Sequence, residues 1–199
     1  KKDRIKQDDK LNPDQRAVRI LGGLQKLLGL PTMPMWIDSF DNSNTQGSNA
    51  VAGCVVFKKG RACKSEYKKF EIKTVEGPDD YASMREVVRR RYSRLMEEGS
   101  PLPDLIIADG GLGQMSAIRE VVEGELGLQI PIAGLKKDNK HRTNTLLYGD
   151  PVQEFGMKVT DEIFRLMVEI QDEVHRFAIS YHKKKRSKAQ TKSELDDIQ

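Results

Sequence analysis

The chain has 199 residues, of which 37% are hydrophobic and 32% charged, and its formal net charge is +4. This length and composition fit one soluble domain with a sizeable core plus flanking tails, and they exclude a wholly disordered chain. No apolar run approaches the length of a transmembrane helix and no signal peptide opens the sequence, so we expect a cytoplasmic protein. Cys54 and Cys63 lack the spacing of a metal site, and we interpret them as free thiols.

The first part of the chain predicts a helix followed by strands. Residues 1–12 form a charged lead-in that we expect to be flexible. A helix is predicted over 13–28 from its apolar spacing, and Gly29 and Pro31 end it, so that 13–30 is the leading segment of the domain. Three strands should follow, at 35–41, 50–57 and 63–72. The tight-turn composition of 58–60 joins the last two as a hairpin.

The second part alternates helices and strands. Helices are predicted at 82–97, 112–124 and 160–181, and strands at 105–108, 130–135 and 144–148. The first of these strands is a continuous apolar run, which is typical of a buried parallel strand. Residues 187–199 are basic and polar, and we expect them to be disordered. This order of elements predicts one α/β domain over 13–186, with a mixed sheet flanked by helices.

Two aspartates stand at the carboxyl ends of apolar strands. Asp41 follows the run that ends at Phe40, and Asp109 follows the run 105–108. In open α/β sheets this edge is where sites are built, and two carboxylates on adjacent central strands would lie within reach of one metal ion. Their like charges disfavour joint ionisation unless a divalent cation lies beside them. A single aspartate of this kind is more often a cap of the following turn, but the pair favours a metal site.

Asp80 and His175 are weaker candidates for the same site. Asp80 stands just ahead of a predicted helix, where capping explains a carboxylate nearly as well as catalysis does. His175 lies on a mostly apolar face of the last helix, so we expect it to point inward near the core edge. Such a histidine is more often a hydrogen-bonded core residue, yet beside two carboxylates it becomes a candidate ligand or proton acceptor. His141 and His182 sit among basic residues, which favours phosphate contact or solvation.

Basic residues are clustered, which favours a polyanionic partner. Most single charge runs are solvated faces, but three runs in a short chain, at 1–4, 89–91 and 182–188, indicate nucleic acid above all. We expect sequence-independent contacts to a DNA backbone from these runs and from the loop after the 130–135 strand. The predicted contact residues are Arg89, Arg90, Arg91, Lys136, Lys137, Lys140, Arg142, Lys183, Lys184, Lys185 and Arg186.

Four motifs occur in order along the chain: "FDNSNTQG", "GPDDYASMREVVRRRY", "PDLIIADGGLGQ" and "DEVHRFAISYHKKKR". In this order and spacing they resemble the C-terminal endonuclease half of UvrC, the incision subunit of bacterial nucleotide excision repair. The resemblance covers about residues 13–188. It implies a ribonuclease H-like fold that cuts DNA on the 5′ side of a lesion. It also implies a site of two aspartates and a histidine.

Matched motif by motif, the functional residues of that family fall on positions that the residues themselves had already indicated. The aspartate of "FD-x-S" is Asp41, that of "DGG" is Asp109, the histidine of "DE-x-H" is His175, and a further family aspartate, in "DDY", is Asp80. The resemblance therefore implies that these four are the catalytic residues, with the first three as metal ligands.

The chain also departs from the family. Asn42 stands where we expect an apolar residue, and Leu112 stands where lysine is frequent, which removes a possible phosphate contact. The N-terminal nuclease domain, the partner-binding segment and the paired helix-hairpin-helix module of the family are not in this sequence. We therefore expect an excised domain of a larger protein, with the tail 187–199 leading toward the missing module.

The predicted chemistry is metal-dependent hydrolysis of a phosphodiester. A Mg²⁺ or Mn²⁺ ion held by Asp41 and Asp109 would polarise the phosphate and lower the pKa of an attacking water, and His175 would ligate the metal or act as general base. The resemblance implies damaged duplex DNA as substrate, and UvrB, the damage-loading subunit, as a partner through parts that this chain lacks. Two alternatives stay open. One is another ribonuclease H-like nuclease, such as a resolvase or an RNA-cleaving enzyme, and the other is an inactive DNA-binding module of that fold.

Overall fold

The computed structural model describes residues 12–43, 50–77, 79–140 and 142–197, with the backbone alone at 144 and 181–197.

The first helix begins at a well-formed cap. Helix α2 spans Pro13–Leu28, as predicted, and the Asn12 side chain accepts a hydrogen bond from the Gln15 backbone N–H at its start. Gly29 ends the helix with a φ of 71°, which glycine adopts at little cost. Apart from Asn12, the lead-in predicted to be flexible lies outside the described residues.

A single mixed sheet forms the centre of the molecule. Its strands are β1 Trp36–Ser43, β2 Val51–Lys58, β3 Arg61–Ala62, β4 Lys68–Glu71, β5 Leu105–Asp109, β6 Ile132–Lys137, β7 Thr143–Tyr148 and β8 Gln153–Gly156. The strand order is β3-β2-β1-β5-β6-β7-β8, and β4 also pairs with β2. β5 is parallel to β1 and to β6, whereas the remaining pairs are antiparallel. The predicted α/β class with a mixed sheet is therefore confirmed, and the carboxyl ends of β1 and β5 meet at one edge.

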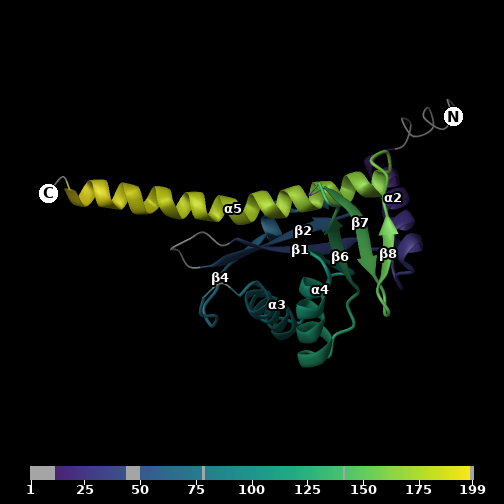
Figure 1. Ribbon diagram of the computed structural model, residues 1–199, viewed down its shortest axis with the longest axis horizontal. Coiled ribbons are helices and arrows are strands. Elements are labelled where there is room, and N and C mark those ends of the chain that lie inside the picture. The colour runs from purple at the N-terminus through teal and green to yellow at the C-terminus, as the bar shows by residue number, and fades with distance from the viewer. Residues whose placement is uncertain (1–11, 44–49, 78, 141, 198–199) are drawn as a thin grey trace.

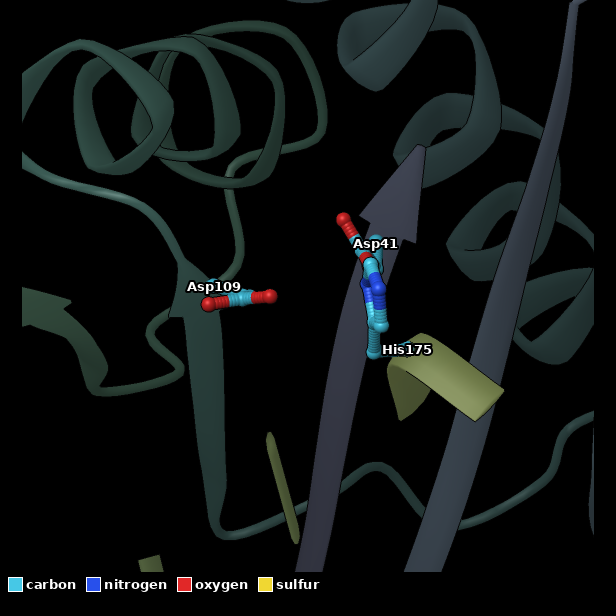
Figure 2. A group of neighbouring side chains, drawn as sticks. All are labelled: Asp41, Asp109 and His175. Carbon is cyan, nitrogen blue, oxygen red and sulfur yellow. The ribbon is translucent and has the colours of Figure 1, made fainter. Parts of the chain in front are cut away.

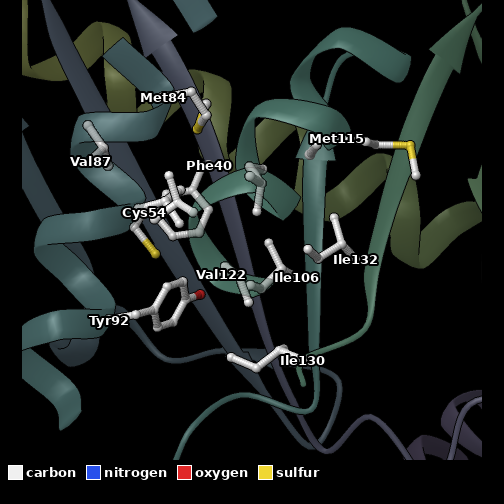
Figure 3. Packing of buried hydrophobic residues seen from close by; sticks show 14 of the residues in the cluster. Phe40, Cys54, Met84, Val87, Tyr92, Ile106, Met115, Val122, Ile130 and Ile132 are labelled. Carbon is white, nitrogen blue, oxygen red and sulfur yellow. The ribbon is translucent and has the colours of Figure 1, made fainter. Parts of the chain in front are cut away.

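Helices cover both faces of this sheet (Figure 1). They are α3 Asp80–Glu97, α4 Leu112–Arg119, continued by a π-helical turn at Glu120–Glu125, and α5 Glu162–Asp197. Helix α5 runs along one face, and α3 and α4 lie on the other (Figure 1). Because successive residues of a strand point to opposite faces, Phe40 and Ile106 pack on the α3 and α4 side (Figure 3). Ile37 and Ile107 pack on the α5 side. Asp41 and Asp109 share the alternation of the second pair and face α5.

Two short strands differ from the prediction. A 3₁₀ turn at Lys64–Glu66 replaces the first part of the strand predicted over 63–72, and only β4 within that range pairs with β2. The short strand β3, which also pairs with β2, lies just before the predicted range. The polar run that forms the turn has no alternating apolar residues to hold it against a core. Strand β8 was not predicted, because it is an edge strand with Phe155 as its one apolar residue, too little for a period of two to be visible.

The last helix is longer than predicted. It begins at Glu162 and continues past 181 to Asp197, through most of the tail 187–199 that the sequence led us to expect as disordered. The reason is local: residues 182–197 contain no glycine or proline and many strong helix formers, a composition that favours a helical backbone. Despite this length, no helix within the described ranges has enough consecutive apolar residues to cross a bilayer.

Candidate metal centre

Strand pairing brings Asp41 and Asp109 together. β1 and β5 run parallel with Phe40 opposite Ala108, so the two aspartates follow at the next position of the register. Both stand at the carboxyl edge of the sheet, on the face that α5 covers. Gly110 follows with a φ of 152°, in a region that residues with a Cβ rarely adopt, and turns the chain from β5 toward α4. The prediction that these two carboxylates would be neighbours is confirmed.

His175 joins the two carboxylates from α5. Its Nδ1 lies 3.1 Å from Asp41 Oδ2. One potential ligand atom from each of Asp41, Asp109 and His175 lies within 4.8 Å of the others, a spacing that a single metal ion can bridge. In Figure 2 the imidazole lies against the Asp41 carboxylate, and the Asp109 carboxylate points one oxygen toward this pair. Three residues far apart in the sequence thus form one cluster of oxygen and nitrogen donors.

The surroundings of Asp41 disfavour its ionised form. Burial raises the pKa of Asp41 from its usual 3.8 to about 6, and the neighbouring Asp109 adds to the rise. The hydrogen bond and charge of His175 oppose these effects and lower the pKa in part. The Asp41 side chain is 15% exposed, so solvent screens this repulsion poorly. A divalent cation bound beside the two carboxylates would offset the repulsion between them.

The position of His175 differs from the prediction in one respect. The histidine was expected to point inward, but its side chain is 64% exposed. The buried face of α5 is formed by Met167, Ile170, Val174 and Ala178. His175 follows Val174 and is therefore rotated by about 100° from the core, which places it at the rim of the carboxylate pair. A packed core histidine, the alternative considered from the sequence, is excluded by this exposure.

Asp80 lies beside the cluster and is not one of its three members. It is the first residue of α3, and the cap of that helix is Asp79, whose Oδ1 accepts the Ala82 backbone N–H at 3.0 Å. The N-cap position considered for Asp80 is therefore occupied by Asp79. Its backbone oxygen accepts a hydrogen bond of 2.9 Å from the Asn42 side chain, which fixes the start of α3 against the residue after Asp41. A catalytic role for Asp80 stays a prediction.

Two residues that sequence reasoning did not select support the aspartates. Asn42, which departs from the family pattern, makes the contact with Asp80 just described. Gln171 donates its side-chain N–H to Asp109 Oδ1 at 2.7 Å and accepts a hydrogen bond from the Thr143 hydroxyl. Gln171 lies one helical turn before His175, and this spacing was the available signal. An uncharged amide at this spacing is not a metal-ligand or catalytic pattern, so the sequence alone does not single it out.

The arginines of the run 89–91 form hydrogen bonds and ion pairs within the protein. Arg91 is buried, and its guanidinium donates from Nε and Nη2 to Asp38 at 2.8 and 3.1 Å. The predicted DNA contact by Arg91 is therefore corrected, because a phosphate cannot reach a buried guanidinium. Arg90 donates to the Glu71 backbone oxygen and to Glu86.

Arg89 is likewise engaged, through a two-pronged ion pair with Glu125 at 2.6 and 2.7 Å. DNA contacts by Arg89 and Arg90 stay predictions, and each would have to compete with these partners. Three adjacent arginines on a helix point in different directions, so a run in the sequence is a weak guide to a surface.

The other predicted cations lie on the β6–β7 hairpin and on α5. Lys136, Lys137, Lys140 and Arg142 are exposed around the hairpin turn. Lys136 pairs with Glu154 at 2.9 Å and Arg142 with Asp138 at 3.4 Å, and such exposed pairs are weak enough for a phosphate to replace them. The backbone of 183–186 belongs to α5, and the side chains of Lys183, Lys184, Lys185 and Arg186 lie outside the described part.

Comparison with known proteins identifies the family. The model of the UvrC RNase H endonuclease domain matches residues 25–179. The chain belongs to this family. It is 63% identical over 198 residues to UvrABC system protein C of Bacteroides thetaiotaomicron, covering 100% of this chain and 32% of that protein. It is 54% identical over 185 residues to the Streptococcus thermophilus protein of the same name, covering 93% of this chain and 30% of that one. The chain thus spans about a third of the length of these relatives.

Solved structures with a similar chain trace include endonuclease V proteins. The one from Ciona intestinalis, in complex with a 24mer DNA, has a TM-score of 0.49 and 12% identity, covering 86% of this chain and 99% of that one. Human endonuclease V has a TM-score of 0.45 and 9% identity, covering 85% and 98%. The family match, and not these similarities, confirms the ribonuclease H-like class expected from the sequence.

Proposed function

We propose that this chain is a metal-dependent DNA endonuclease domain that makes the incision on the 5′ side of a lesion in nucleotide excision repair. The observation that carries the proposal is the cluster of Asp41, Asp109 and His175 within 4.8 Å, at the sheet edge of a chain from the UvrC endonuclease family. Intact ligands in this arrangement argue against an inactive DNA-binding module. Membership of the family argues against a resolvase or an RNA-cleaving relative.

The donor set fits Mg²⁺ or Mn²⁺. Carboxylate oxygens are the ligands that these hard cations prefer, and one imidazole is compatible with Mn²⁺. The pKa of Asp41 is raised to about 6 by burial first and by the Asp109 charge second, and a cation at this position would offset both effects. Asp41 and Asp109 would hold the ion, with His175 beside them. When bound, a divalent ion supplies Lewis-acid polarisation of a phosphate oxygen and lowers the pKa of an attacking water.

Proton transfer falls to His175 in this proposal. Its Nδ1 is engaged by Asp41 Oδ2, and a carboxylate oxygen can only accept, so Nδ1 carries the proton in the neutral ring. The lone pair is then on Nε2, which is the atom that can take a proton from the attacking water. The exposure of the ring leaves room for a substrate. As the products of in-line attack by water we expect a 3′-hydroxyl and a 5′-phosphate.

Backbone contacts would hold the DNA without reading its sequence. The exposed side chains of Lys137 and Lys140 on the β6–β7 hairpin are suited to phosphates, and the exposed cations of Lys136 and Arg142 can join them by leaving their carboxylate partners. Such contacts predict weak binding that falls steeply with salt. In the full-length protein we expect UvrB and damaged duplex DNA as partners and a cytoplasmic location.

The proposal is tested by the substrate that is cut. The chain would be incubated with lesion-containing duplex, RNA–DNA hybrid and branched DNA, each with Mn²⁺, with Mg²⁺ and with a chelator. We expect nicks in duplex DNA that require a divalent ion, with only slight lesion preference because the damage-loading partner is absent. Cleavage confined to the hybrid or to the branch point would replace the proposal with one of the other nuclease classes.

A chimera tests the side of incision. This chain would replace the corresponding segment of the Bacteroides thetaiotaomicron relative, to which it is 63% identical. With the remaining repair components present, we expect the chimera to cut 5′ of the lesion and the same chimera carrying Asp41→Asn not to cut there. A chimera that cuts equally well with and without this substitution would show that the 5′ incision does not come from this domain.

A further inference from the structure

We propose that Gln171 is a positioning residue that fixes the Asp109 carboxylate for metal binding and ties it to the β6–β7 hairpin through Thr143. The inference rests on the proposed metal-dependent function and adds a residue and a route to it. Gln171 Nε2 lies 2.7 Å from Asp109 Oδ1, and Gln171 Oε1 accepts from the Thr143 hydroxyl. No side chain in this series of contacts is a metal ligand except Asp109.

The orientation of the amide follows from its two neighbours. Asp109 offers only acceptor oxygens when ionised, so the amide must present its N–H₂ group to the carboxylate. The carbonyl oxygen of Gln171 is then directed to Thr143, whose hydroxyl donates to it. A reversed amide would place a carbonyl oxygen against a carboxylate oxygen, which is repulsive. The contact with Asp109 therefore holds Gln171 in one orientation, and Gln171 in turn restricts the rotation of the carboxylate.

This contact matters because Asp109 stands beside another carboxylate. One Asp109 oxygen points toward Asp41 and the other points away (Figure 2). One oxygen of each carboxylate lies within 4.8 Å of the other, so the ionised side chains repel each other and an unsupported Asp109 side chain would rotate away when no cation is bound. The amide N–H holds it in place without adding charge. A ligand that is already in position loses less rotational freedom when the metal binds.

Thr143 extends the connection to the basic hairpin. It is buried at the first position of β7 and pairs with Lys137 at the irregular register step between Lys136 and Lys137. Its neighbour along the chain is Arg142. The element that presents the predicted phosphate contacts is thus joined by two hydrogen bonds to a predicted metal ligand. These hydrogen bonds fix the position of the hairpin, which would hold the DNA, relative to Asp109, which would hold the ion.

The experiment measures metal binding without relying on cleavage. The melting temperature would be recorded against Mn²⁺ concentration for wild type, Gln171→Met, Thr143→Val and Thr143→Ser, since an ion bound to the folded state raises it by mass action. Gln171→Met keeps the length of the side chain and removes both hydrogen bonds. We expect the half-saturating Mn²⁺ concentration to rise about 10–100-fold, the range typical of groups that orient a metal ligand. Thr143→Val should raise the half-saturating Mn²⁺ concentration by a smaller factor. Thr143→Ser, which keeps the hydroxyl, should have the wild-type value.

Asp172→Asn serves as the matched control. Asp172 is the next residue of α5, is exposed and lies in a shallow surface groove with Val168, and neither Asp41 nor Asp109 lines that groove. This variant should bind Mn²⁺ like wild type. A purely structural Gln171 would lower the metal-free melting temperature and leave the half-saturating concentration unchanged, and that result would overturn the proposal. If Gln171→Met does not fold, equal Mn²⁺ binding by Thr143→Val and Thr143→Ser overturns it instead.

Nicking of duplex DNA by the same preparations separates this inference from the proposed function. If wild type binds Mn²⁺ but cuts no DNA, while Gln171→Met binds the ion more weakly, the proposed function fails and the positioning role stands. If wild type cuts DNA and Gln171→Met binds Mn²⁺ as tightly as wild type, the proposed function stands and the positioning role fails.

Discussion

Strand β1 carries two aspartates on opposite faces of the sheet, and their surroundings are opposite as well. Asp38 is fully buried on the α3 side and accepts hydrogen bonds from the Arg91 guanidinium, from Tyr92 Oη at 2.7 Å and from Trp36 Nε1 at 2.8 Å. Asp41 lies on the α5 side with a second carboxylate, that of Asp109, and the imidazole of His175. One carboxylate is compensated by a permanent cation, and the other stands against a like charge.

The difference between the two aspartates separates a structural carboxylate from a site. Both are removed from water, which alone would disfavour the charged form. At Asp38 a two-pronged guanidinium and two neutral donors offset that cost inside the protein. At Asp41 no lysine or arginine of the described residues does so, and its pKa is raised to about 6. A buried carboxylate without a compensating cation indicates a place for an external one.

The largest expected effect is that of Asp41→Asn on catalysis. We expect the rate of divalent-dependent nicking to fall by about a thousandfold or more, because a metal ion supplies several kcal/mol of transition-state charge stabilisation. The rise of melting temperature with Mn²⁺ should vanish as well. The metal-free variant should be at least as stable as wild type at neutral pH, since the substitution removes the repulsion with Asp109. A variant that nicks at the wild-type rate would remove Asp41 from the site.

The matched substitution Asp38→Asn should act on stability instead. It leaves the Arg91 charge buried without its partner, which typically costs about 3–5 kcal/mol of unfolding free energy. Chemical denaturation measures this loss. The nicking rate per folded molecule, and the Mn²⁺ concentration for half-saturation, should stay near wild type. Equal losses of rate per folded molecule in both variants would show that the two faces of β1 are not functionally distinct.

The next largest effect is expected for His175→Ala, and it again concerns the rate of nicking. Its side chain is 64% exposed, so its removal leaves no cavity and should change the melting temperature little. The nicking rate should fall by roughly a hundredfold, as expected when a general acid–base group is lost. DNA affinity should persist, because lysine and arginine supply it. Melting, binding and nicking measured on one preparation decide the matter, and a stable variant of nearly unchanged rate would leave a site of two aspartates.

The sequence predicted the parts of the molecule that are periodic or that stand at strand ends. The helix over 13–28, the central strands and the neighbourhood of Asp41 and Asp109 follow from apolar patterns and from the meeting of parallel strands at one edge. These features depend on local spacing, which a sequence displays directly. The candidate ligands could therefore be found before the fold was seen.

Contacts between distant elements could not be predicted in this way. Arg91 stands in a basic run, yet it pairs with Asp38 on another element. No local pattern in the sequence around Asp38 indicates this partner. Gln171 acquires a role only because α5 passes over the end of β5 and the start of β7. The orientation of α5 decides as well that His175 lies at the rim and not in the core. Tertiary packing supplies this information, and single-residue patterns do not contain it.

The smallest expected effect is the pH dependence of metal-free stability. The folded pKa of Asp41 is about 6 against 3.8 in the unfolded chain, so the folded state holds this proton more tightly. Stability from this group is fully present below about pH 4 and is lost as the pH rises through 6, because the unfolded chain gives up its proton first. The shift corresponds to about 3 kcal/mol, which we reduce to about 2 kcal/mol for the partial exposure of the group.

Asp109 and His175 are titratable neighbours, so the contribution of Asp41 must be measured as a difference. The unfolding free energies of wild type and of Asp41→Asn would be determined by urea denaturation between pH 4 and pH 7, in the presence of a chelator. Wild type should lose about 2 kcal/mol relative to the variant over this range. Adding Mn²⁺ at pH 7 should restore the loss in wild type alone, because the ion replaces the proton as the partner of Asp41. A constant difference across this range would mean that Asp41 is already compensated within the protein, as Asp38 is, and the contrast between the two faces of β1 would no longer mark a metal site.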